Sequence, residues 1–128
     1  MRYFCVDYGS KRIGTAVSNA EGTIAFPRTT VPNNQSAIAA IVEMIAAEKA
    51  EALVFGDTRT LEGGENPVTV EAESFAAKLG DAARITVAFA REAGSSRGAS
   101  EEAGGHDDAA AAAFILQRYL DMHTRRVE

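Results

Sequence analysis

The chain has 128 residues, with 13 basic and 18 acidic side chains and a formal net charge of −5. This length suits a single domain over residues 1–128, and 46% hydrophobic with 24% charged residues excludes wholesale disorder. The single cysteine excludes an intramolecular disulfide and a cysteine-based zinc site, which favours a reducing, cytoplasmic compartment. The longest uncharged apolar run, residues 109–116, is far shorter than the roughly 20 residues that a membrane-spanning helix needs.

The N-terminal part predicts three strands. Residues 2–7 and 13–18 are rich in aromatic and β-branched types, and a short turn joins them. Residues 19–22 have the composition of a hairpin connection, and residues 23–26 predict a third strand that we expect to stop at Pro27. Such tight connections favour an antiparallel meander.

The hydrophobic period then changes to that of a helix. Asn33 or Asn34 is the expected N-cap of a first helix, whose apolar side chains recur every three to four residues over 38–45. Residues 52–56 predict a buried strand, and residues 57–65 a polar loop. Asn66 and Pro67 begin a second helix, for which Gly80 is the expected C-cap.

The remaining chain predicts one more strand and one more helix. Residues 85–89 form the fifth strand, residues 90–106 show no convincing period and predict a mobile loop, and a last helix covers about 107–123. The element order is therefore β-β-β-α-β-α-β-α. A meander followed by two strand–helix units indicates an α/β domain with a mixed five-stranded sheet flanked by helices.

Asp7 is the first candidate site residue because it ends a strand that we expect to be central. Ligands of open α/β sheets bind at the carboxyl ends of such strands, and Gly9 allows a close approach of the backbone. Asp7 therefore either takes part in a cation or phosphate site or caps the turn.

Asp107 and Asp108 open the last helix, where one aspartate can cap the helix. Helical spacing places Asp108 on the same stripe as Leu116, the face expected to pack on the sheet. An inward carboxylate needs a partner, and a metal ion is a suitable one.

A third carboxylate would complete a divalent-cation site. Glu92, three residues beyond the fifth predicted strand, is a candidate at the same sheet edge, and Glu62 and Glu65 in the other long loop compete with it. Lys11 and Arg12 either contact phosphate oxygens or form a solvated hairpin edge. The residues alone thus favour metal-dependent phosphoryl chemistry.

Three segments resemble one known family. Residues 7–18, DYGSKRIGTAVS, resemble the signature D-x-G-x-K-R-I-G-x-A-x-S of the YqgF/RuvX family of pre-16S rRNA nucleases and Holliday-junction resolvase-like proteins. Residues 108–120 resemble its closing motif D-x-x-A-A-x-x-I-L-Q-x-Y-L, and residues 54–79 resemble its middle segment. The resemblance covers nearly the whole chain and implies an RNase H-like fold.

The resemblance implies a metal-dependent nuclease that hydrolyses phosphodiester bonds of structured nucleic acid, either pre-rRNA or branched DNA, in the cytoplasm and away from membranes. Asp7, Glu92 and Asp108 match the family's catalytic carboxylates and would bind Mg²⁺ or Mn²⁺. The turn residues Gly9, Lys11 and Arg12 would bind the nucleic acid. A homodimer is the assembly that we expect if the chain associates with itself.

The segment around Glu92 departs from the family pattern. Arg91 and Ala93 stand where the family has an acidic residue and an arginine. This departure and the net charge of −5 keep a second hypothesis open, namely a catalytically impaired RNase H-like module that binds nucleic acid or a protein partner.

Overall fold

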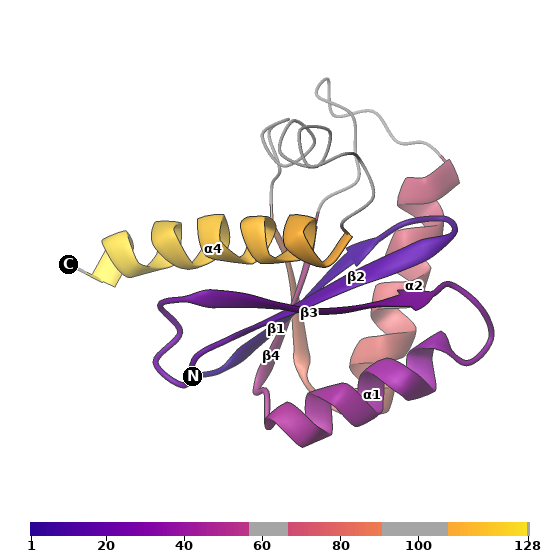
Figure 1. Cartoon of the computed structure of the whole chain (residues 1–128), viewed down its shortest axis with the longest axis horizontal. Coiled ribbons are helices and arrows are strands. Elements are labelled where there is room, and N and C mark those ends of the chain that lie inside the picture. The colour runs from indigo at the N-terminus through magenta and orange to yellow at the C-terminus, as the bar shows by residue number, and fades with distance from the viewer. Residues whose placement is uncertain (57–66, 91–107, 128) are drawn as a thin grey trace.

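The computed structural model describes residues 1–56, 67–90 and 108–127. Its elements follow the predicted order (Figure 1). They are β1 Tyr3–Tyr8, β2 Arg12–Ser18, β3 Ala25–Pro32, α1 Ala37–Glu48, β4 Ala52–Gly56, α2 Pro67–Ala83, β5 Thr86–Ala90 and α4 Asp108–Val127. The predicted loop over 57–65 lies outside the described residues, as does the predicted loop over 90–106 except for Ala90, which is the last residue of β5.

One five-stranded mixed sheet forms the centre of the molecule, with the strand order β3-β2-β1-β4-β5. The first three strands pair antiparallel as a meander, whereas β1, β4 and β5 run parallel. The prediction of a central first strand is therefore confirmed. Because the parallel strands point the same way, their carboxyl ends lie together at one end of the sheet, which we call its carboxyl edge.

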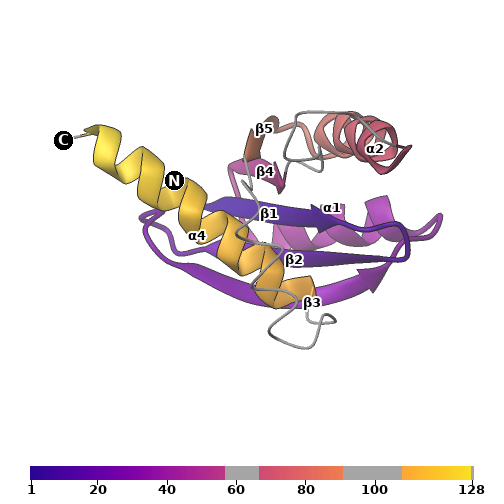
Figure 2. The ribbon, with the colours of Figure 1, turned by 90° about the horizontal axis from the view of Figure 1, so that it is seen from above.

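Helices cover both faces of the sheet (Figure 2). On one face, α1 and α2 pack against alternate residues of β1, including Phe4 and Val6. On the other face, α4 packs through Leu116 and its neighbours against Cys5. The side chains of Phe4, Cys5 and Val6 are all fully buried, as expected for a strand that is covered on both sides.

The third strand is longer than predicted, since β3 continues through Pro27 to Pro32. Proline is tolerated because β3 is an edge strand, where a missing N–H removes no interior ladder bond. The ladder between β2 and β3 is irregular between Gly14 and Ala16, and Thr15, which lies between these two residues, is buried. Its hydroxyl donates to the carbonyl of Thr29 at 2.6 Å and accepts from the N–H of Thr29 at 3.0 Å.

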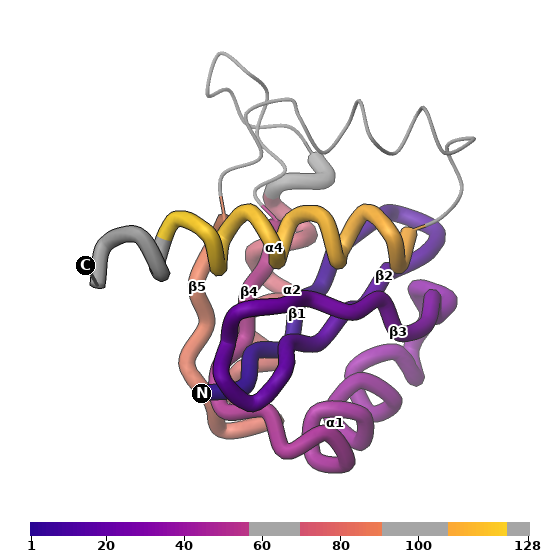
Figure 3. Tube along the Cα trace, turned by 60° about the vertical axis from the view of Figure 1, so that its left-hand side comes forward, coloured from indigo at the N-terminus to yellow at the C-terminus, as the bar shows by residue number. Residues whose placement is uncertain are grey.

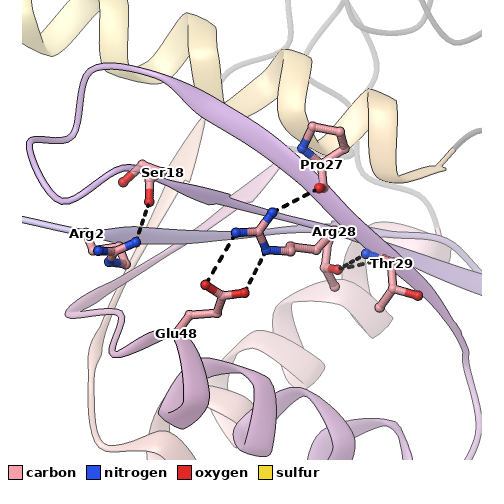
Figure 4. A network of polar contacts seen from close by, with 7 residues as sticks. Arg2, Ser18, Pro27, Arg28, Thr29 and Glu48 are labelled. Carbon is pink, nitrogen blue, oxygen red and sulfur yellow. Dashed lines mark hydrogen bonds and ion pairs between the residues drawn. The ribbon is translucent and has the colours of Figure 1, made fainter.

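Polar contacts connect the meander to its surroundings on the side of α1 (Figure 4). Arg28 on β3 donates from Nε to Glu48 of α1 at 2.6 Å and from Nη2 to the other carboxylate oxygen at 3.5 Å. Arg2 donates to the carbonyl of Ser18 at 3.4 Å. The edge strand is thus linked to the helix that lies under it.

The ends of the helices differ from the prediction. Ser36, not Asn33 or Asn34, is the N-cap residue of α1, and the Asn34 carboxamide oxygen instead accepts from the Ser36 N–H at 2.9 Å. Gly80, the expected C-cap, lies inside α2, which continues to Ala83. A Cβ at Gly80 would sit 2.7 Å from Cγ2 of Val87, so the glycine allows the helix to pack closely on β5.

The chain leaves α2 at Arg84, which adopts a left-handed φ of 61°. The last helix continues to Val127, beyond the predicted end near 123. In the described parts of the chain, no helix has the length and apolar character required to cross a membrane.

Candidate active site

The first carboxylate of the site comes from the end of the central strand. Asp7 pairs with Gly14 in the antiparallel ladder between β1 and β2. Side chains alternate along a strand, so Asp7 lies on the same face as Cys5, which packs against α4. Asp7 is half-buried at this position. The strand therefore places a carboxylate on the α4 side of the sheet, at its carboxyl edge.

The second carboxylate is brought to the same place by a glycine. A Cβ on Gly14 would lie 2.8 Å from Cβ of Asp108 and would overlap the Asp108 carbonyl group. The first turn of α4 therefore rests on the bare backbone of β2, beside which it lies in Figure 3. Since residues paired across an antiparallel ladder have Cα atoms about 4.5–5.5 Å apart, Asp7 and Asp108 are neighbours across Gly14.

Arg12, the first residue of β2, is paired with one of these carboxylates. Its Nε donates to Oδ2 of Asp108 at 2.8 Å. The Arg12 side chain is 47% exposed and that of Asp108 is 21% exposed. An ion pair this accessible to water contributes at most about 1 kcal/mol, so an incoming phosphate or cation can replace it. Lys11 beside it is exposed and adds a second cation.

The turn that carries these cations is held by Gly9 and Asn33. A Cβ on Gly9 would come within 2.5 Å of the Arg12 carbonyl oxygen, so the turn closes too tightly for a side chain. Asn33 donates from Nδ2 to the Gly9 carbonyl at 2.8 Å and from its backbone N–H to the Lys11 carbonyl at 3.0 Å. Sequence reasoning missed this role of Asn33, because a long-range bond to a turn leaves no periodic signal.

Gln117 fixes the far part of α4. Its Nε2 donates to the Thr23 carbonyl at 2.9 Å, and its Oε1 accepts from the Ala25 N–H at 2.9 Å. These bonds attach the helix to the hairpin between β2 and β3. Sequence reasoning did not assign this contact, although a carboxamide among the apolar residues of a packed helix was a signal for it.

The structure places five of the six predicted site residues at one edge of the sheet: Gly9, Lys11 and Arg12 in the turn and its adjoining strand, with Asp7 and Asp108 beside them. Glu92 lies outside the described residues, as do its competitors Glu62 and Glu65. Within the described ranges, no three acidic, histidine or cysteine side chains are close enough to hold a metal ion. The two carboxylates that the structure brings together, those of Asp7 and Asp108, offer oxygen ligands, which suit Mg²⁺ or Mn²⁺.

A mixed sheet of this order, with an aspartate on the central strand and another on the helix across it, defines the RNase H-like class of folds. Among solved structures, the Thermus thermophilus RuvC in complex with Holliday junction substrate superposes with a TM-score of 0.65 at 14% identity, covering 97% of this chain and 96% of that one. The fowlpox virus Holliday junction resolvase gives 0.57 at 13% identity, covering 95% and 99%. At this identity the likeness shows the fold.

Sequence comparison gives the family. Residues 1–122 match the family model RuvX, described as Holliday junction resolvase. A Bordetella avium protein named "Putative pre-16S rRNA nuclease" is 36% identical over 119 residues, covering 90% of this chain and 91% of the relative. The chain therefore belongs to the RuvX family, a nuclease family.

Proposed function

We propose that this protein is a divalent-metal-dependent nuclease that hydrolyses phosphodiester bonds of structured nucleic acid at the edge formed by Asp7 and Asp108. The observation that carries the proposal is the contact of Asp108 with Gly14, the ladder partner of Asp7, because it joins two carboxylates 101 positions apart in the chain. Precursor rRNA and branched DNA are the candidate substrates, since the relatives and the family carry these two descriptions.

Asp7 and Asp108 would hold Mg²⁺ or Mn²⁺ through their carboxylate oxygens. When bound, such an ion supplies an activated water and stabilises the charge on the leaving oxygen. The half-buried position of both aspartates supports this role, because a carboxylate removed from water is stabilised by a cation.

Glu92 is the proposed third ligand. It follows the end of β5 by two residues, and β5 ends at the same edge of the sheet as β1. Its place in the chain, just beyond a strand that runs parallel to β4 and β1, is what supports this assignment.

Lys11 and Arg12 would bind the phosphate groups beside the scissile bond. Arg12 donates to Asp108 in the free protein, and a phosphate oxygen is an equivalent acceptor for its guanidinium group. Exchange of Asp108 for phosphate would keep Arg12 paired and would leave Asp108 to the metal. Action on precursor rRNA would place the protein in the cytoplasm, and its one cysteine, the buried Cys5, forms no intramolecular disulfide.

The test is cleavage of branched DNA and of precursor rRNA in Mn²⁺ by the wild type, Asp7→Asn and Asp108→Asn. We expect both variants to lose metal-dependent cleavage while keeping the fold, because the amide is nearly isosteric with the carboxylate but is neutral and a weak ligand. Asp81→Asn is the matched control, since Asp81 is exposed on α2. Undiminished cleavage by both site variants would overturn the proposal.

The catalytically impaired module remains the alternative, and calorimetric titration with Mn²⁺ separates the two. The nuclease proposal predicts a binding isotherm that Asp108→Asn abolishes. The alternative predicts that the wild type itself gives no heat of binding, together with no cleavage.

A further inference from the structure

A hollow lies at the same end of the molecule as Asp7 and Asp108, on the opposite face of the sheet. It has a volume of about 600 Å³ and lies between residues 33–38, which lead into α1, and residues 70–78 of α2. The side chains that matter for its chemistry are Tyr8, Asn33, Gln35, Ser74, Phe75 and Lys78. Its volume falls within the range of about 300–1,000 Å³ that is usual for small-ligand sites.

This hollow borders the candidate active site through β1. Tyr8 follows Asp7 directly, and alternation along the strand places the two side chains on opposite faces. Tyr8 packs on the α2 side, where its ring lies 5.2 Å from that of Phe75. Asn33, which lines the hollow, also holds the turn that carries Lys11. A nucleic-acid strand that crosses this edge of the sheet would therefore contact both the candidate active site and the hollow.

The lining combines three kinds of group. The rings of Tyr8 and Phe75 are half-buried and tilted by 55° to each other, and they offer aromatic surface. Asn33 and Gln35 carry carboxamides, which both donate and accept hydrogen bonds. Lys78 is an exposed cation on α2, and the one acidic residue of the lining is Glu71.

Such a lining suits a nucleotide better than other small ligands. Unpaired bases are bound by stacking on aromatic side chains and by hydrogen bonds to their edges, whereas their phosphates need a cation. A metal ion would need several carboxylates, but the lining has one, and a purely apolar ligand would make no use of the Gln35 carboxamide or the Lys78 cation.

We propose that this hollow binds one unpaired nucleotide of the substrate strand, with Lys78 contacting its phosphate, next to the phosphodiester held at Asp7 and Asp108. The proposal rests on the proposed nuclease function and adds that the substrate has a single-stranded segment beside the cleavage point. It also assigns two nucleotide-contacting positions, Gln35 and Lys78.

The experiment measures binding of a fluorescent single-stranded oligonucleotide to the full chain in EDTA, by anisotropy, over a range of salt concentrations. Each phosphate contact contributes about 0.7 to the slope of log K against log salt for single strands. Lys78→Gln is expected to lower the slope by about that amount. Arg84→Gln is the matched control, because Arg84 is an exposed cation just beyond the C-terminal end of α2 that does not line the hollow, and it should leave the slope unchanged.

A second measurement changes the ligand instead of the protein. A set of oligonucleotides, each lacking the base at one position, is titrated against the wild type and Gln35→Ala. Loss of a stacked base is expected to weaken binding about fivefold or more at one position of the set. Gln35→Ala should weaken binding of the intact oligonucleotide. It should weaken binding of the oligonucleotide that lacks the bound base less, because the base that Gln35 would contact is already missing there.

The outcomes separate this inference from the proposed function. Equal slopes for Lys78→Gln and Arg84→Gln, or equal affinity for every abasic strand, would overturn the nucleotide site and leave the nuclease proposal standing. If the chain shows these effects of Lys78→Gln and of the abasic strands but never cleaves in Mn²⁺, the proposed function alone is overturned, because the binding assay in EDTA contains no free metal.

Discussion

Gly14→Ala tests whether one close contact determines both the stability of the fold and the geometry of the site. The added methyl group would lie 2.8 Å from Cβ of Asp108 and overlap the carbonyl group of that residue. Favourable contacts between carbon atoms are about 3.5–4.0 Å long, so the first turn of α4 must move by about 1 Å. The obstacle is backbone, which cannot rotate away as a side chain can.

The expected cost follows from two opposing effects. Overpacking of a well-packed contact costs about 1–3 kcal/mol, and a clash with backbone belongs at the upper end of that range. Replacement of glycine by alanine restricts the unfolded chain and returns about 0.4–1 kcal/mol. We therefore expect Gly14→Ala to lower the free energy of unfolding by about 2 kcal/mol.

The assay is urea denaturation together with calorimetric titration of Mn²⁺. Gly80→Ala is the matched control, because its added methyl group also clashes, with Cγ2 of Val87 at 2.7 Å, but on the opposite face of the sheet from Asp108. We expect the control to lower stability and to leave Mn²⁺ binding intact, because α4 keeps its place. If Gly14→Ala unfolds like the wild type and binds Mn²⁺ equally well, the contact does not position Asp108.

Two further predictions concern stability. Thr15→Val removes the hydroxyl that bonds both backbone groups of Thr29, so we expect the free energy of unfolding in urea to fall by about 1 kcal/mol. Thr29→Val is the control and should be nearly neutral, because only the backbone of Thr29 takes part. Equal losses in the two variants would contradict the assignment. Burial, and then the neighbouring Tyr3, raises the pKa of Tyr119 above its usual value of 10.0. The unfolded chain therefore ionises first as the pH rises, so the stability contribution of Tyr119 is intact below pH 10 and declines above it. Tyrosinate absorbance should show this late ionisation, and Tyr119→Phe should remove it; a Tyr119 that titrates at 10.0 would refute the prediction.

Much of the fold could be predicted because it depends on local patterns. The meander, the two strand–helix units and the central position of the first strand follow from apolar periodicity and short connections. The errors fall where a local rule meets a tertiary contact. Pro27 was expected to end β3, but an edge strand tolerates it, and Gly80 was expected to end α2, but it packs on Val87 instead.

The candidate site divides in the same way. The inward position of Asp108 was predictable from the helical stripe that it shares with Leu116, and the structure confirms that this stripe packs on the sheet. The pairing of Arg12 with Asp108 was not predictable, because the two residues are 96 positions apart and no local pattern links them. The metal-binding role of Glu92 and the expected homodimer stay predictions.

The closing helix is attached to the sheet at two points, and this explains why its motif carries polar residues at both. Asp108 rests on Gly14 at the start, and nine residues later Gln117 bonds the Thr23 carbonyl and the Ala25 N–H. These points are about 13.5 Å apart along the helix axis, so together they prevent the helix from pivoting on its apolar face. Apolar packing alone is non-directional and would allow α4 to slide across β2 and β3. The polar attachments set its position, and the position of α4 sets how close Asp108 lies to Asp7.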